Sequence, residues 1–191
     1  MFFILQFLLA GYLNYIDMRF QEFMFENIQN RIIYLDMDGV LADFRGGYQK
    51  LFGSIPNMNA KDDANVSRLV GTDFFAHLDK LPDADRIVDL AIKYAGSYSI
   101  CSSPLRGDHK NSAQNKIKWI QENLNPQPND IVITGKKDSY AKGKNILIDD
   151  RQKVLQPWIE RGGIGIWYNA YIHDVSKVEK ELAEIFKDSR G

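Results

Sequence analysis

Short apolar runs alternate with helix-like patterns through most of this chain, and this alternation limits its fold more than any other feature. The predicted strands cover residues 31–36, 97–101, 130–134, 145–148 and 163–167. The predicted helices cover residues 83–95, 109–124, 151–161 and 175–187. Strands that alternate with helices form a parallel sheet covered on both faces. We therefore predict a doubly wound α/β fold, which binds its ligands at the carboxyl ends of the strands.

Residues 42–80 interrupt this alternation. They contain no convincing strand, only helix-like pieces around 44–52 and 65–78. Because the segment begins directly after the end of the first predicted strand, we expect it to form a small helical cap subdomain. The core domain then comprises residues 31–41 and 81–191.

Residues 1–30 precede the first predicted strand. The apolar, uncharged stretch 1–16 is shorter than the roughly 20 residues of a membrane span, and it lacks the basic start and clear cleavage site of a secretory signal. Three interpretations stay open: an amphipathic helix, a weak anchor, or sequence upstream of a true start at Met18 or Met24. We treat the segment as an extension without an assigned role and expect no membrane association.

Charge and cysteine content narrow the function. With 24 basic and 25 acidic residues, the chain lacks the basic surface of a general nucleic-acid binder, so a small molecule is the expected partner. One basic group could serve a small anion: Arg106, His109, Lys110, Lys116 and Lys118. The single cysteine, Cys101, lies in an apolar run, which is typical of a buried, reduced thiol in a cytoplasmic protein.

Polar side chains stand at the ends of four predicted strands. In chain order these are Asp36 and Asp38, then Ser102 and Ser103, then Lys136 and Lys137, then Asp149 and Asp150. If the strands are neighbours, the four acids and a lysine meet in one crevice, where the acids need a cation. Carboxylate oxygens suit Mg²⁺, which keeps several waters and shares them with a phosphate. Each group alone has an ordinary explanation as a helix cap, turn or surface pair, but the four together indicate a site.

The same stretches resemble a known superfamily. DMDGV after an apolar strand, a hydroxyl after the second strand, and IDD closing the fourth resemble the haloacid dehalogenase-like phosphohydrolases. Within them, DMDGVLADFRGGYQKLFG, TDFFAHL, ICSSP and ILIDDR resemble the 5'(3')-deoxyribonucleotidases, and WIERGGIGIWYN is similar to bacterial and phage nucleotidases. The resemblance covers about residues 31–170. It implies a Mg²⁺-dependent phosphatase that hydrolyses (deoxy)nucleoside monophosphates through an aspartyl-phosphate.

The resemblance also assigns roles to the strand-end residues. Asp36 matches the nucleophile and Asp38 the general acid and base, and strand alternation puts both on one side of the extended chain. The metal ligands would be Asp36, the Asp38 carbonyl and one acid of the pair Asp149 and Asp150, with Asp150 favoured. Ser102 and Lys137 match the groups that hold the phosphoryl oxygens, with Lys136 as the alternative lysine and Ser103 as a neighbouring contact.

The predicted cap contains aromatic residues that could contact the substrate. At one other position the sequence departs from the family pattern. Phe44, Phe74 and Phe75 match positions where aromatic rings enclose the base, although such residues equally form the core of a small subdomain. Gly135 stands where the deoxyribonucleotidases carry an Arg, which puts that side chain's substrate contacts in doubt. His77 is expected to be structural.

Two other functions stay open. The first is a phosphatase for another small phosphoester such as a sugar phosphate, which the missing Arg keeps in play. The second is a binding protein that has lost catalysis, which the complete set of acids, hydroxyl and lysine argues against. Relatives are often dimers, so a homodimer is an expectation for which the sequence shows no surface.

Overall fold

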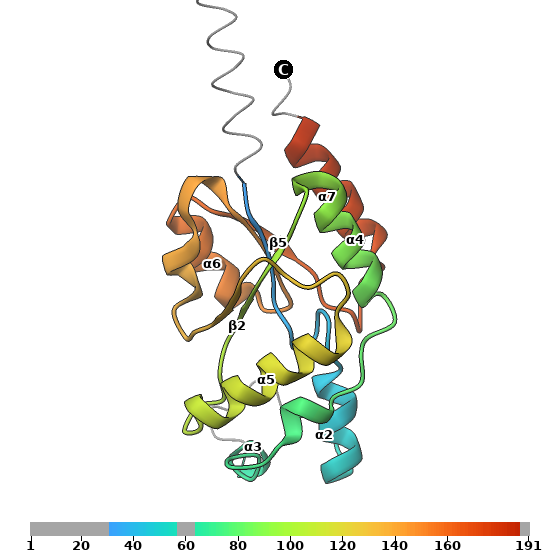
Figure 1. Ribbon diagram of the computed structural model, residues 1–191, viewed down its shortest axis with the longest axis vertical. Helices are drawn as coiled ribbons and strands as arrows, with labels where there is room; N and C mark the ends of the chain where they lie inside the picture. Colours follow the sequence, from blue (N-terminus) through green and yellow to red (C-terminus); the bar gives the residue numbers. More distant parts are fainter. Residues whose placement is uncertain (1–30, 57–63, 188–191) are drawn as a thin grey trace, which may run out of the picture.

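The computed structural model describes residues 31–56 and 64–187, and its centre is one five-stranded parallel sheet with helices on both faces (Figure 1). The strands are β1 (Ile33–Leu35), β2 (Ser99–Ser102), β3 (Ile131–Ile133), β4 (Ile146–Asp149) and β5 (Ile164–Trp167). They lie in the order β3-β2-β1-β4-β5. The predicted doubly wound α/β fold is confirmed. Residues 1–30, which form the predicted N-terminal extension, lie outside the described residues.

Different helices cover the two faces of the sheet. Since neighbouring residues of a strand point to opposite faces, each strand contributes to two separate cores. Ile33 and Leu35 of β1 belong to one core cluster, whereas Tyr34 between them belongs to the other. The larger cluster includes residues of α4 (Ala84–Ala95), α5 (His109–Asn123) and α7 (Ser176–Lys187). The smaller one includes residues of α6 (Gln152–Glu160), which lies across the sheet from α4 and α7 (Figure 1). All four helices begin and end within one residue of their predicted bounds.

The segment between β1 and α4 is short-helical. It contains α2 (Phe44–Phe52), α3 (Ala64–Ser67) and the 3₁₀ helix η1 (Phe74–His77), and no strand among its described residues. The predicted piece 65–78 is therefore two short helices. The chain turns between them, and Gly71 there has a φ of 74°, a left-handed conformation that a continuous right-handed helix does not contain.

The two ends of this segment are paired with each other. Ala42 forms an antiparallel bridge with Lys80, the Asp43 amide donates to the Asp79 carbonyl at 2.8 Å, and the Leu81 amide donates to the Leu41 carbonyl at 2.9 Å. The chain therefore leaves and re-enters the core at one place. We propose on this basis that residues 42–80 form one inserted unit, beside the end of β1 (Figure 1).

Two short 3₁₀ helices, η2 (Lys137–Tyr140) and η3 (Lys142–Lys144), connect β3 to β4. Within residues 31–56 and 64–187, no helix is both long and apolar enough to cross a bilayer.

Candidate active site

Asp36 lies directly after β1 and is 2% exposed. Its Oδ1 accepts hydrogen bonds from the Met37 amide and is 2.8 Å from Lys137 Nζ. Burial alone would raise the pKa of Asp36, but the positive charges of Lys137, Arg151 and Lys116 outweigh it, so the pKa is well below its usual range. The carboxylate is therefore ionised, and among the described residues the one cation paired with Oδ2 is Arg151, whose Nη2 lies 3.9 Å away. Asp36 thus keeps one oxygen for a reaction partner or a cation.

The acids at the ends of β1 and β4 meet because these strands are neighbours, with Leu35 opposite Ile148. Carboxylate oxygens of Asp36, Asp149 and Asp150 lie within 4.8 Å of one another. Oxygen donors gathered in this way fit a hard divalent cation. The donor set therefore suits a divalent metal ion, whereas its identity as Mg²⁺ stays a prediction.

Asp149 and Asp150 differ in what holds them. Asp149 is fully buried; its Oδ2 accepts from Lys137 Nζ at 2.7 Å and its Oδ1 accepts from the Arg151 amide at 2.9 Å. Asp150 lines an open cavity instead. Burial and the charges of Asp36 and Asp149 raise the pKa of Asp150 to about 8, so a cation would have to displace a proton at neutral pH. Asp150 is the freer ligand of the two.

Gly39 lets the β1 loop approach Asp150. Its φ is 77°, and a Cβ placed on it would lie 2.8 Å from Asp150 Oδ2. A side chain at this position would therefore suffer both strain and a collision.

Of the two lysines after β3, only Lys137 enters the acid cluster. It is 3% exposed and bridges Asp36 and Asp149, whereas Lys136 is exposed. Burial lowers the pKa of Lys137, but the two carboxylates raise it by more, so the ammonium stays charged. One buried cation thus offsets part of the charge of the acids.

Ser102, the last residue of β2, is completely buried, and its Oγ accepts a hydrogen bond from Lys116 Nζ at 3.0 Å. The same ammonium lies 2.6 Å from Asp38 Oδ2. The sequence placed Lys116 only in a loose basic group. Its contact with both predicted site residues depends on how α5 packs beside β2, which no local pattern reveals.

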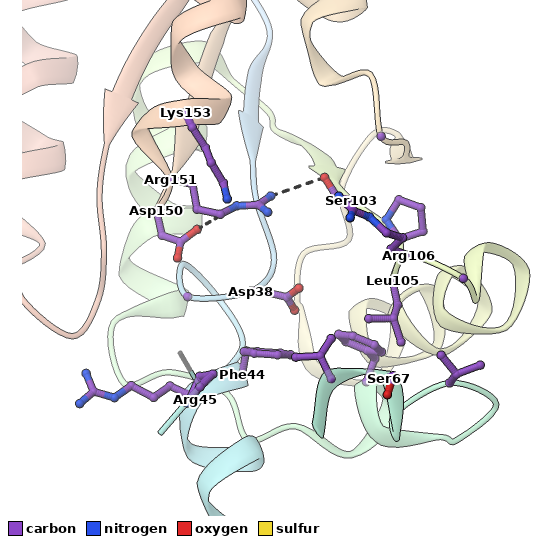
Figure 2. Close-up of a pocket in the computed structure, with 18 of the residues that line it drawn as sticks. Asp38, Phe44, Arg45, Ser67, Ser103, Leu105, Arg106, Asp150, Arg151 and Lys153 are labelled. Atoms are coloured by element: carbon purple, nitrogen blue, oxygen red, sulfur yellow. Dashed lines mark hydrogen bonds and ion pairs between the residues drawn. The ribbon is translucent and has the colours of Figure 1, made fainter. Parts of the chain in front are cut away.

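Arg151 is a second residue that the sequence did not assign. Its guanidinium lies 3.7 to 3.9 Å from Asp36, Asp149 and Asp150, and its Nη2 donates to Ser103 Oγ at 3.5 Å. Figure 2 shows it reaching across the cavity from the Asp150 side to Ser103. The only signal in the sequence was its place directly after the two acids of ILIDDR.

The cavity beside these groups has a volume of about 860 Å³, within the range of about 300–1,000 Å³ typical of small-molecule sites. In Figure 2 the Asp38 carboxylate points between Arg151 and Ser103 on one side and Phe44 on the other. An apolar part of the lining comes from Ile55, Val66, Phe75 and Leu105. Two basic residues, Arg106 and Lys153, also line the cavity.

The three predicted aromatic residues form one cluster. Phe44 and Phe75 line the cavity and are stacked, with ring centroids 6.1 Å apart and planes at 22°. Phe74 does not line it; its ring packs edge-on against both others, at 5.6 and 5.3 Å. Two of the rings thus face the cavity, and the third packs against both. His77 is exposed and pairs with Asp73 at 3.1 Å.

The structure also shows the surroundings of Gly135 and Trp167. Gly135 lines the cavity, and a Cβ there would meet nothing within 4 Å, so the space for a side chain is open. Trp167, at the end of β5, donates from Nε1 to the Asp150 carbonyl at 3.0 Å and so helps to fix the β4 loop.

Comparisons with known proteins agree with this geometry. Residues 63–186 match the family described as 5' nucleotidase, deoxy (pyrimidine), cytosolic type C protein. The chain belongs to this family. This match confirms the predicted resemblance to the 5'(3')-deoxyribonucleotidase family of haloacid dehalogenase-like phosphohydrolases.

Individual members of the 5' nucleotidase family show the same relationship at low identity. The mitochondrial 5'(3')-deoxyribonucleotidase of Mus musculus is 27% identical over 146 residues, which cover 64% of this chain and 65% of the mouse protein. The cytosolic-type enzyme of Homo sapiens is 26% identical over 145 residues, covering 64% of this chain and 71% of the human one. A protein of Vibrio phage KVP40 is 28% identical over 142 residues, which cover 74% of either chain. The match thus spans just under two thirds of the mouse relative.

Proposed function

We propose that this protein is a Mg²⁺-dependent phosphatase that hydrolyses deoxynucleoside monophosphates to nucleoside and phosphate. One observation carries the proposal: an ionised, buried carboxylate, Asp36, keeps one oxygen free beside two further acids and two cations. Asp150 and Arg151 of this group line the cavity. The names of the relatives, 5'(3')-deoxyribonucleotidases, support the choice of substrate.

In the first step Asp36 attacks phosphorus. A bond forms between a carboxylate oxygen and phosphorus, the bond from phosphorus to the nucleoside oxygen breaks, and its electron pair leaves with that oxygen. Asp38 donates a proton to this oxygen, so that an alcohol rather than an alkoxide departs. The product is nucleoside and an aspartyl-phosphate on Asp36.

In the second step water attacks the aspartyl-phosphate. Asp38, now a carboxylate, takes a proton from the water, and the bond between Asp36 and phosphorus breaks to restore the free carboxylate. Lys137, Ser102 and Ser103 would hold the phosphoryl oxygens, as a charge and two hydroxyls, while Arg151 offers a further cation from the same wall.

The metal would be held by Asp36, the Asp38 carbonyl and Asp150, with Asp149 beside them. When bound there, Mg²⁺ offsets the charge that would otherwise keep a carboxylate and a phosphate apart. The 4.8 Å cluster of carboxylate oxygens and the unblocked Asp150 support this assignment.

The wall of residues 42–80 would receive the nucleoside. Stacking of a base on an aromatic ring contributes about 1–3 kcal/mol and tolerates many bases. Phe44 and Phe75 are placed for this contact, with Phe74 supporting both rings. We place the reaction in the cytoplasm, since Cys101 is a free buried thiol and one relative is of the cytosolic type.

A phosphatase for another small phosphoester, such as a sugar phosphate, is the second candidate. It is favoured by Gly135, which leaves open the space where the deoxyribonucleotidases carry an Arg.

The test is phosphate release from deoxy- and ribonucleoside monophosphates and sugar phosphates, each with Mg²⁺ and with EDTA. Metal-dependent release with preference for deoxynucleotides supports the proposal. Release from sugar phosphates alone would replace it by the second candidate, and no release from any substrate would contradict both.

A further inference from the structure

Lys116 is a buried charge that contacts three residues of the candidate site. Its side chain is 1% exposed, and its Nζ lies 2.6 Å from Asp38 Oδ2, 3.0 Å from Ser102 Oγ and 4.8 Å from the centre of the Phe75 ring. Lysine is almost never fully buried unless it is paired, because desolvating the ammonium is costly. The role of such a residue is therefore to be sought in the groups that it touches.

The ammonium has little capacity left for a substrate. It has three N–H donors, and two of them are taken by Asp38 and Ser102 while the ring of Phe75 covers a further side. This arrangement differs from that of Arg151, whose guanidinium faces the open cavity. Lys116 is thus placed to act through its neighbours.

The Asp38 carboxylate depends on this contact for its orientation. Its Oδ1 is buried and has no hydrogen-bond partner among the described residues, so Lys116 at Oδ2 is what holds the group there. Asp38 lies in a loop after β1, whereas Lys116 lies inside α5, a helix of 15 residues. A side chain on a regular helix fixes a loop residue more precisely than another loop could.

We propose that Lys116 is a positioning residue that holds the Asp38 carboxyl group toward the leaving oxygen of the substrate. The inference rests on the proposed function. In the step concerned, the bond from phosphorus to the leaving oxygen breaks, and the proton of Asp38 goes to that oxygen as its electron pair departs. By also binding Ser102, Lys116 sets the distance between the proton donor and the group that holds the phosphoryl oxygens.

Comparing two leaving groups distinguishes a residue that positions the general acid from a residue that holds the phosphoryl group. A nucleoside leaves as an alkoxide unless it is protonated, and it therefore needs the general acid. The p-nitrophenolate anion is stable without a proton, so p-nitrophenyl phosphate needs the acid far less. A residue that acts through Asp38 should therefore matter for the nucleotide and much less for the nitrophenyl ester.

The experiment compares kcat of the full-length protein on thymidine 5'-monophosphate and on p-nitrophenyl phosphate, with Mg²⁺. In Lys116→Met, which keeps most of the side-chain length, we expect kcat to fall about 10²–10⁴-fold for the nucleotide, the usual contribution of a general acid. For the nitrophenyl ester the loss should stay below about 10-fold. Gln114→Met, at an exposed position of the same helix, is the matched control and should leave both rates unchanged.

A second comparison tests whether Lys116 acts through Asp38. Asp38→Asn should lose the nucleotide reaction, and adding Lys116→Met to it should cost less than about threefold more, because residues that act as one unit are not additive. If Lys116→Met does not fold, Lys116→Arg replaces it. Arg keeps the charge but shifts the donors, so it should still slow the nucleotide reaction more than the nitrophenyl ester.

Equal losses on both substrates, unchanged rates on both, or additive losses in the double variant would overturn the inference alone. A wild-type protein that hydrolyses neither substrate would overturn the proposed function and the inference with it.

Discussion

Asp36 combines two properties that oppose each other in most carboxylates: it is buried and it stays ionised. The cost of burial is offset by Lys137, Arg151 and Lys116, which bring the pKa below its usual range. A buried anion has lost much of its hydration, and an oxygen that is not tied to a donor can react. This environment supports the proposed role of Asp36 as the nucleophile.

Asp36→Asn should abolish turnover, by at least about 10³-fold in kcat, because the amide oxygen cannot form a stable phosphoryl intermediate. The substitution keeps the size of the side chain, so the fold should persist, as circular dichroism can check. Asp89→Asn, at an exposed site on α4, is the control and should keep full activity. An Asp36→Asn variant as active as the wild type would sink the nucleophile assignment.

At the scale of elements, the start of α2 is tied to the loop that follows β5. Asp43 caps α2 by accepting from the Gly46 amide at 2.7 Å, and it also accepts from the Tyr171 hydroxyl at 2.6 Å. The same hydroxyl accepts from the Arg45 amide at 3.0 Å. These bonds hold Phe44, the first residue of α2, at the wall of the cavity.

Gly46→Ala should destabilise this junction. A Cβ on Gly46 would lie 2.1 Å from Asp43 Oδ2, so the carboxylate must move and lose its bonds to the helix start and to Tyr171. We expect a loss of about 1–3 kcal/mol in the free energy of unfolding, measured in urea. Gly135→Ala is the matched control, since its Cβ would meet nothing within 4 Å. Equal stability of the two variants would contradict the prediction.

Tyr171→Phe removes one hydroxyl from the same junction and keeps the ring. Losing the hydrogen bonds to the Asp43 carboxyl group and from the Arg45 amide, each worth about 0.5–3 kcal/mol, should loosen α2. We expect KM for the nucleotide to rise by about 2–10-fold, with kcat little changed. Steady-state kinetics on the proposed substrate check this. Tyr140→Phe, in η2 between β3 and β4, serves as the control. A fall in kcat at constant KM would place Tyr171 in the chemistry instead.

At the scale of the whole molecule, the acid cluster links stability to pH and to metal. Burial, Asp36 and Asp149 raise the pKa of Asp150 to about 8, far above that of the unfolded chain, and the pKa of Asp149 is raised as well, mainly by burial. The folded state therefore holds a proton that the unfolded state has released. The stability from this group is complete below about pH 4 and is lost as pH rises through about 8.

In EDTA, the melting temperature should accordingly fall between pH 6 and pH 9. If the cluster holds Mg²⁺ as proposed, excess Mg²⁺ should bind the ionised carboxylates of the folded state and remove or reverse this fall. Thermal unfolding followed by fluorescence measures both series. In Asp150→Asn the fall in EDTA should be smaller, and identical pH profiles with and without Mg²⁺ would count against a metal at this cluster.

The predictions that succeeded were those that depend on local patterns. Apolar residues recur about every two positions in a strand and every 3.6 positions in a helix. The sequence therefore placed the ends of the core helices to within one residue. The piece 65–78 fared worse, since its residues support two short helices around a left-handed Gly71 rather than one. Short elements carry too few repeats for the period to decide.

By itself, the sequence determined the succession of strands and helices along the chain, the parallel sheet, and the acids at the ends of β1 and β4. These features depend on periodicity, which is a property of neighbouring residues. Only the tertiary structure decided which side chains meet. Lys116 reaches Asp38 across 78 positions, and Tyr171 reaches Asp43 across 128. Such contacts follow from how whole helices and loops pack around a shared cavity, and packing is a property of the assembled chain rather than of any stretch within it.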